Sequence, residues 1–185
     1  RTHAERYHAD PAAVIPMGFS AGGHLAGCAG LMWNKPEVYR PLKKKSAAFR
    51  PDGVVMCYPV VTSGPMAHRG SMDNLLGDRE EELAETVSLD KRVRRGAPPF
   101  FLWHTADATC VPVENTLLLA KALEARGVDV EARIYPHGRH GQSLADHTAF
   151  APDEARHISV PCAVWVQHCD AWLQRHFGAG RREEV

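Results

Sequence analysis

Four stretches of the chain have the pattern of strands in a buried sheet. Apolar residues follow one another at positions 13–17, 53–58 and 100–104, and apolar and polar residues alternate at positions 128–135. Both patterns are typical of β-strands, and the continuous runs are typical of strands covered on both faces. Pro16 is unusual inside a strand, because proline cannot donate a ladder hydrogen bond. We predict four strands, the first of them disturbed by Pro16.

Helical patterns lie between and after these strands. Apolar residues recur at helical spacing in segments 21–33, 113–126 and 157–177, and shorter helices with charged surfaces are predicted at 68–77 and 79–88. Strands that alternate with helices predict an α/β fold. We expect a single domain over residues 1–185, with a mainly parallel sheet of about four strands flanked by helices.

The remaining segments are predicted to be less regular. Residues 2–9 have the pattern of a helix end, stopped by Asp10 and Pro11. The polar segments 34–51 and 136–156 are predicted to be loops, and the charged tail 181–185 is predicted to be a frayed end.

Composition and charge restrict the classes of function. The chain has 185 residues, 44% of them apolar, and its 22 Lys and Arg residues balance its 22 Asp and Glu residues. A nucleic-acid-binding protein normally has a basic excess, so no nucleic-acid partner is expected. No apolar run approaches the roughly 18 residues that a membrane span requires, so no membrane partner is expected either.

The cysteines indicate the compartment. Five cysteines, an odd number in a chain of this length, predict buried free thiols in a reducing compartment, and hence a cytoplasmic protein. The chain begins with Arg1 rather than Met, so an upstream signal peptide stays open as an alternative.

The strongest chemical signal is the turn between the first strand and the first helix. Residues 18–22 read Gly-Phe-Ser-Ala-Gly and match the G-x-S-x-G pattern of a serine nucleophile on a sharp strand-to-helix turn. Such a turn strains the backbone of Ser20 and exposes its hydroxyl, and small residues at Gly18 and Gly22 let strand and helix pass closely. The backbone N–H of Ala21, at the helix start, is placed to donate to an oxyanion. The alternative is a structural glycine turn that happens to contain serine.

A serine nucleophile needs a base, and the base needs an orienting acid. In hydrolases with this turn, the chain order is Ser, then Asp or Glu, then His. Asp107 follows the third strand and His140 follows the fourth, so both lie at carboxyl ends of strands, where open α/β sheets hold their sites. We predict Ser20, Asp107 and His140 as catalytic residues. The alternatives are a turn or capping role for Asp107, and a solvated loop position for His140 or for a neighbouring histidine.

Other histidines and cysteines are assigned structural roles. His24 lies one helical turn beyond the serine and is expected to pack or form a hydrogen bond near the turn, and His104 is expected to be structural. The histidines of segment 137–147 do not have the spacing of a common zinc motif, so no metal is expected. Cys110 is not expected to be a nucleophile, because it would need a base of its own.

Several stretches together resemble one known family. They are Met-Gly-Phe-Ser-Ala-Gly-Gly-His-Leu-Ala at 17–26, Cys-Tyr-Pro-Val at 57–60, Ala-His-Arg-Gly-Ser at 67–71, Trp-His-Thr-Ala-Asp at 103–107, Val-Pro-Val-Glu-Asn at 111–115 and His-Gly at 140–141. They resemble the esterase/lipase branch of the α/β-hydrolases, in particular carbohydrate acetyl esterases similar to acetylxylan esterases. The resemblance implies a serine carboxylesterase that hydrolyses short acyl esters, above all acetyl esters on carbohydrate, through an acyl-enzyme on Ser20 and without a metal or organic cofactor.

The chain departs from this family in three ways. The family has an earlier Gly-rich segment with further oxyanion donors, and about three more strand–helix units, and none of these lies in the 19 residues before Ser20. We therefore expect a partial fold that corresponds to the C-terminal two-thirds of the family's domain and lacks its N-terminal strands. Alone, it is expected to be weakly active or inactive and prone to aggregate. Ala108 stands where relatives often have a second Asp, and residues 145–157 form a longer stretch before the last helix.

Two other functions stay open at this point. One is a serine peptidase of the prolyl-oligopeptidase type, which shares the turn and the order of the three residues. The other is a non-catalytic protein with a hydrolase fold. The expected partner is a small-molecule ester, and a homo-oligomer is an open alternative because an exposed first strand invites pairing between chains.

Overall fold

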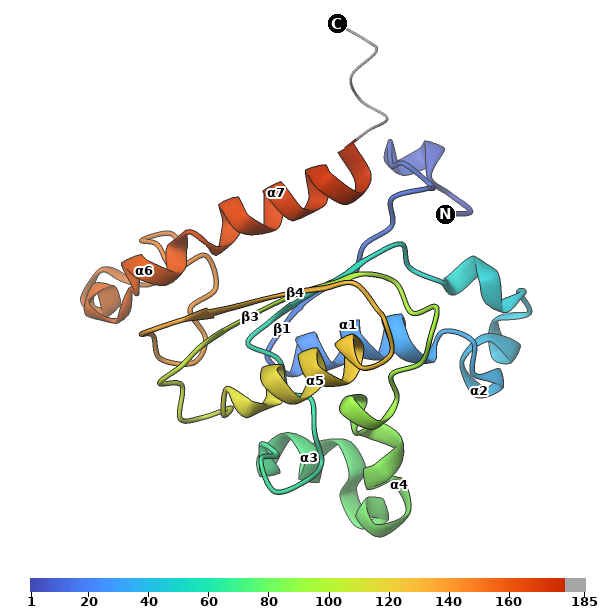
Figure 1. Ribbon diagram of the computed structural model, residues 1–185, viewed down its shortest axis with the longest axis horizontal. Helices are drawn as coiled ribbons and strands as arrows, with labels where there is room; N and C mark the ends of the chain where they lie inside the picture. The colour runs from blue at the N-terminus through green and yellow to red at the C-terminus, as the bar shows by residue number, and fades with distance from the viewer. Residues whose placement is uncertain (179–185) are drawn as a thin grey trace, which may run out of the picture.

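The computed structural model describes residues 1–178 and shows a parallel sheet between helices (Figure 1). The strands are β1 (Met17–Phe19), β2 (Val54–Cys57), β3 (Phe100–Thr105) and β4 (Val130–Tyr135), and they lie in this order across the sheet. All three neighbouring pairs are parallel. The predicted α/β fold with four parallel strands is therefore confirmed. The predicted frayed tail, 181–185, lies outside the described residues.

Helices cover both faces of the sheet. On one face lie α1 (Ala21–Met32) and α5 (Glu114–Glu124), and on the other lies α7 (Trp165–Phe177), preceded by the short α6 (Val160–Ala163) (Figure 1). The helices α3 (Arg69–Leu76) and α4 (Glu80–Val87) lie outside α1 and α5, and α2 (Pro36–Tyr39) follows α1. None of the helices in residues 1–178 is long and apolar enough to span a membrane.

The two central strands are buried because their side chains alternate between two apolar clusters. Val54 and Met56 of β2 pack with α1 and α5, whereas Val55 and Cys57 pack with Cys162 of α6 and with the two tryptophans of α7. In β3 every residue is buried. Apolar area removed from water stabilises the fold by roughly 25 cal/mol per Å², so continuous apolar runs favour this two-sided burial.

The first strand begins later than the apolar pattern predicts. The expected strand was 13–17, but pairing with β2 runs from Met17 to Phe19, into residues predicted to form the turn. Pro16 explains the shift, because it has no N–H to donate and contributes only its carbonyl oxygen, which accepts from the Val55 N–H at 2.9 Å. Within residues 1–178, β1 pairs with β2 alone and forms one edge of the sheet.

Three other predicted segments differ in detail. The predicted loop 34–51 contains α2 and two 3₁₀ turns, and the predicted helix end at 2–9 is a single 3₁₀ turn, Glu5–Tyr7. The predicted helix 157–177 is divided into a 3₁₀ helix that ends at residue 157, α6 and α7. Pro161 sits in the first turn of α6, where a proline is tolerated, and it fixes a new helix start.

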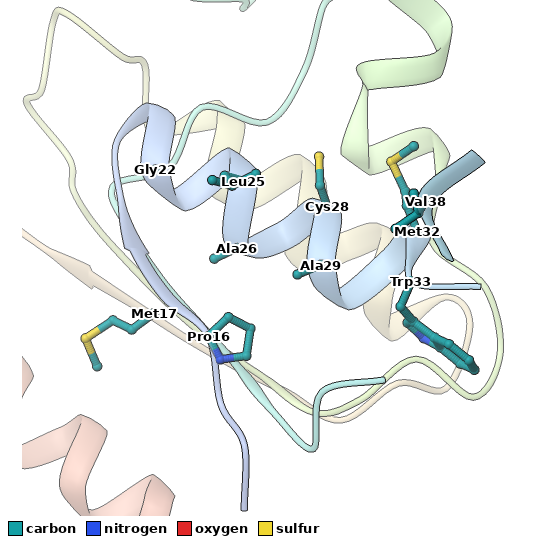
Figure 2. A pocket seen from close by; sticks show the side chains of 10 residues that line it. All are labelled: Pro16, Met17, Gly22, Leu25, Ala26, Cys28, Ala29, Met32, Trp33 and Val38. Carbon is teal, nitrogen blue, oxygen red and sulfur yellow. The ribbon is translucent and has the colours of Figure 1, made fainter. Parts of the chain in front are cut away.

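An apolar groove runs along the free edge of β1 and the outer side of α1 (Figure 2). It has a volume of about 460 Å³ and is lined by residues that include Met17, Leu25, Cys28 and Trp33. Leu25 is 72% exposed and Met17 is 47% exposed. The exposed strand edge that the sequence predicted is therefore present in the described chain, with apolar side chains beside it.

The strand-to-helix turn depends on one very close backbone contact. A Cβ atom at Gly18 would lie 2.0 Å from the carbonyl oxygen of Gly22, so only glycine fits at position 18. The prediction for Gly22 itself was wrong, since no heavy atom of the described chain would lie within 4 Å of a Cβ there. Gly23 is the second tight position, because its Cβ would lie 2.9 Å from that of Pro59.

We expect Gly18→Ala to destabilise the protein strongly and Gly22→Ala to be tolerated. The first change forces the backbones of β1 and α1 apart and is expected to cost about 3 kcal/mol, the upper end of the usual range for overpacking. The second enters open space in a helix, where Ala is favoured over Gly by up to about 1 kcal/mol. Urea unfolding of the two variants measures both values. Equal unfolding midpoints would contradict the assigned contact.

Candidate active site

Ser20 occupies a strained backbone position between β1 and α1. Its φ is 55° and its ψ is −120°, a conformation that non-glycine residues rarely adopt. Its N–H donates to the Cys57 carbonyl at 2.9 Å, and its own carbonyl accepts from the Val60 N–H at 3.1 Å. These bonds fasten Ser20 to the end of β2 and the residues that follow it. The predicted sharp turn is therefore present, with Ser20 at its apex.

His140 lies against the hydroxyl of this serine. Its Nε2 is 2.7 Å from the Ser20 Oγ, although 120 residues separate the two in the chain. For Nε2 to accept the serine proton, the neutral ring must carry its own hydrogen on Nδ1. Burial lowers the pKa of His140 below the ordinary value, and the nearby His68 lowers it further. The ring is therefore kept neutral, which is the form that can act as a base.

The structure does not join Asp107 to His140. The Asp107 carboxylate instead accepts from the Gly138 N–H at 2.8 Å and contacts the Nδ1 of His137 at 3.2 Å. The Gly138 N–H is the main cause that holds the pKa of Asp107 below its usual value. The Nδ1 of His140 is buried and has no hydrogen-bond partner among the described residues. The three predicted residues are thus divided between two histidines, with Ser20 on His140 and Asp107 on His137.

The start of the loop after β4 explains this division. The Thr105 hydroxyl donates to the Gly138 carbonyl at 2.6 Å, and the Ser159 hydroxyl donates to the His137 carbonyl. Gly138 has a φ of 154°, so the chain folds back over the end of β3 at this point. His137 and Gly138 therefore lie beside Asp107, and His140 lies against Ser20.

Tyr58 packs against His140 and was not singled out from the sequence as a site residue. Its ring packs edge-on against His140, with ring centroids 5.0 Å apart, and its hydroxyl accepts from the Ser143 N–H at 2.9 Å. Tyr58 directly follows β2 and has a φ of 38°, so the chain turns sharply there. A large side chain between a buried strand and Pro59 is a signal that could have indicated this contact.

Ala21, the predicted oxyanion donor, directly follows Ser20 in the chain. Ala21 is the first residue of α1, and the first N–H groups of a helix have no partner within the helix. Its N–H therefore lies next to the nucleophile at the positive end of the helix dipole.

Two other histidines have the structural roles that the sequence predicted. The His24 Nε2 is 2.8 Å from the Val87 carbonyl, which ties α1 to the end of α4. His104 is fully buried between the Thr116 hydroxyl at 2.8 Å and the Val111 carbonyl at 2.9 Å. Burial lowers the pKa of His104 to about 4, so it stays neutral. Among residues 1–178, no three His, Cys, Asp or Glu side chains are grouped to hold a metal ion.

Comparisons with known proteins identify the family and the fold of the chain. The BD-FAE family profile matches residues 1–123. Endo-1,4-beta-xylanase B of Butyrivibrio fibrisolvens is 36% identical over 153 residues, which are 82% of this chain and 24% of that protein. Acetylxylan esterase of Xylanibacter ruminicola is 31% identical over 147 residues, which are 76% of this chain and 28% of that protein. The chain thus spans about a quarter of the length of these two relatives.

A solved structure matches most of the fold. The acetyl ester-xyloside bifunctional hydrolase of Caldicellulosiruptor lactoaceticus is similar with a TM-score of 0.76 and 38% sequence identity, over 94% of this chain and 60% of that one. The match extends well beyond the segment of the family profile. The chain belongs to the BD-FAE family and has the fold of the α/β-hydrolases.

Proposed function

We propose that this protein is a serine carboxylesterase that hydrolyses short acyl esters, above all acetyl esters of carbohydrates. The observation that carries the proposal is the 2.7 Å contact between the Ser20 Oγ and the His140 Nε2. A hydroxyl next to a neutral imidazole is the arrangement that nucleophilic acyl transfer requires. The names of the relatives support the substrate class, because they include an acetylxylan esterase and an acetyl ester-xyloside hydrolase.

The reaction follows from the positions of the groups. The Ser20 oxygen attacks the ester carbonyl while His140 takes the hydroxyl proton, and the Ala21 N–H donates to the oxyanion that forms. His140 then gives the proton to the departing alcohol oxygen, which leaves an acyl group on Ser20. Water, deprotonated by His140, releases the acid by the same route. The protein's own residues supply each proton transfer.

We propose that Asp107 completes the triad as the reaction proceeds. When His140 gains the serine proton it becomes a cation, and the hydrogen on its buried Nδ1 then needs an anionic acceptor. Asp107 is held by residues two and three positions before His140, so its carboxylate lies next to the same loop. An exposed contact with His137 is weak because solvent screens it. Asp107 therefore exchanges His137 for His140 as the positive charge develops.

An apolar cavity beside the oxyanion donor offers room for the acyl group. It has a volume of about 350 Å³ and lies between α1 and α3, with Ala21, Val60, Met72 and Leu75 in its wall. Ala21 and Val60 flank the Ser20 backbone, so the cavity begins next to the nucleophile. An acetyl group fits easily, and the apolar wall favours acyl chains over charged groups.

Substitutions of Ser20 and His140 test the proposed nucleophile and base. We expect weak hydrolysis of p-nitrophenyl acetate and of acetylated xylooligosaccharides by this chain alone, and we expect Ser20→Ala and His140→Ala each to lower kcat by about 10³-fold or more. A fluorophosphonate probe should label Ser20 in the unmodified chain and should label neither variant. Faster cleavage of a dipeptide amide than of the esters would indicate a peptidase. No labelling of the folded chain, and none of a version that is extended upstream, would indicate a non-catalytic protein.

Substitutions of Asp107 and His137 show which histidine of the loop, His137 or His140, Asp107 assists in the reaction. Asp107→Asn is expected to lower kcat by roughly 10²–10⁴-fold, because it removes the acceptor for the His140 cation. His137→Ala should leave kcat within about threefold, because it removes only the exposed contact of Asp107. Steady-state kinetics of both variants decide the assignment. A larger loss in His137→Ala than in Asp107→Asn would show that His137 orients the site.

The proposed role of His140 also predicts how activity depends on pH. Only the neutral form of His140 can accept the serine proton, and the pKa of this residue is lowered by burial and by His68. We expect kcat/KM, which reports the free enzyme, to fall with decreasing pH and to reach half its plateau below the ordinary histidine value of 6.5. His68→Asn should move the half-point upward. A half-point above 6.5 in the unmodified protein would mean that Asp107 already binds His140 before substrate arrives.

A further inference from the structure

A fully buried amide lies two residues after the proposed base. Gln142 belongs to the irregular loop after β4, yet its side chain is enclosed and both of its polar atoms have partners. Its Nε2 donates to the Arg139 carbonyl at 3.2 Å and to the His157 carbonyl at 2.9 Å. Its Oε1 accepts from the Ser159 N–H at 2.9 Å. Because an unpaired amide is costly to bury, these partners fix both the position and the orientation of the Gln142 side chain.

These bonds enclose the backbone of His140. Within residues 1–178, that backbone forms no hydrogen bond to another backbone group. The Arg139 carbonyl belongs to the planar peptide that joins Arg139 to His140, so the bond from Gln142 restricts the backbone orientation at His140. The same amide ties this peptide to residues 157 and 159, which precede α6. The base is therefore held through its neighbours, and Gln142 connects them.

Other contacts hold the loop at points before and after the base. Before it, the Ser159 hydroxyl donates to the His137 carbonyl. After it, the Ser143 N–H donates to the Tyr58 hydroxyl and the Ser143 carbonyl accepts from the Trp165 Nε1, both at 2.9 Å. These contacts fix the two ends of segment 137–143, and the buried amide connects the residues between them. The peptide that carries the base is thus the part of the loop that depends most directly on the amide.

We propose that Gln142 is a positioning residue, which holds the His140 ring against Ser20. The proposal rests on the proposed ester hydrolysis, in which the His140 Nε2 takes the Ser20 proton over 2.7 Å. Proton transfer requires a hydrogen-bond distance of this kind, and a displacement of about 1 Å can lower a rate by about 10²-fold. Gln142 touches neither reacting atom, so it acts on the reaction only through the placement of His140.

Loss of this position should also change the pKa of His140. Burial lowers that pKa, and the nearby His68 lowers it further. A ring that moves toward solvent, or toward the Asp107 carboxylate, has a better stabilised charged form, so its pKa rises. Tyr58 packs on the ring and His104 lies near it; burial raises the pKa of the first to about 12 and lowers that of the second to about 4. Neither changes its charge near neutral pH, so the shift reports the position of His140.

The test compares Gln142→Met with the unmodified chain. Methionine has a similar length and volume but forms none of the amide's hydrogen bonds. We expect kcat for p-nitrophenyl acetate to fall by about 10²-fold while KM stays within about threefold, because Gln142 does not contact the substrate. We also expect the pKa of the His140 ring, measured by NMR titration and assigned with His140→Asn, to rise. If Gln142→Met fails to fold, Gln142→Asn is measured instead, because its shorter side chain stays polar but cannot reach all of these partners.

Asn115→Leu is the matched control. Asn115 is also a fully buried amide, and the hydrogen-bond partners of its side chain are backbone groups outside the loop after β4. Its substitution should lower the urea unfolding midpoint about as much as that of Gln142, because both leave buried backbone groups unpaired. In this control kcat should stay within about threefold and the pKa of His140 should not change.

Failure of the positioning role is distinguishable from failure of the proposed ester hydrolysis. If the unmodified chain hydrolyses the ester, kcat decides, and a Gln142→Met value within about twofold of the unmodified value overturns the proposal. An equal loss in Asn115→Leu also overturns it, because the effect is then general destabilisation. If the unmodified chain hydrolyses no ester, the proposed hydrolysis fails and the pKa of His140 decides. A rise in Gln142→Met alone then supports the positioning role, and the absence of a rise refutes it.

Discussion

At Gly18 the backbone of β1 passes so close to the first turn of α1 that a Cβ atom would lie 2.0 Å from the carbonyl oxygen of Gly22. This contact leaves the chain a very short path from strand to helix, and Ser20 takes the strained conformation that the path requires. The strain is held by hydrogen bonds to Cys57, at the end of the buried strand β2, and to Val60, in the buried segment that follows it. Ser20 is thus held in place by the packed core beneath it.

The sequence predicts best those elements that the core itself dictates. Strands β2 and β3 are continuous apolar runs buried on both faces, and no other arrangement removes so much apolar area from water. The errors occur where burial is weaker. Strand β1 lies at an edge and its limits depend on the hydrogen-bonding capacity of Pro16, and the last predicted helix is divided at Pro161. Hydrophobic patterns carry little information on such backbone details.

In the candidate site, too, some features are predictable from the sequence and others depend on local backbone details. Ser20 and His140 follow from a motif and from chain order, because the ends of parallel strands meet at one edge of the sheet. The partner of Asp107 cannot be predicted from the sequence, because it depends on how the five residues after β4 fold back on Thr105 and Ser159. The same applies to Gln142, whose contact with Ser159 crosses 17 residues and arises from packing between the loop after β4 and the segment before α6.

Among the described residues the buried Nδ1 of His140 has no hydrogen-bond partner, and Asp107 lies on His137 and Gly138 instead. An unsatisfied buried donor costs about 1–3 kcal/mol, so the neutral ring already favours an acceptor there. Moving the Asp107 carboxylate inward opposes this gain, because the charge must lose water and the Gly138 N–H that stabilises it. If His140 takes the serine proton, the free energies of the two Asp107 positions change. The attraction between the Asp107 carboxylate and the His140 cation is then added, in a site that is partly shielded from solvent. On the mechanism proposed above, the Asp107 carboxylate stays on the Gly138 N–H while His140 is neutral and moves to the His140 Nδ1 when His140 becomes a cation.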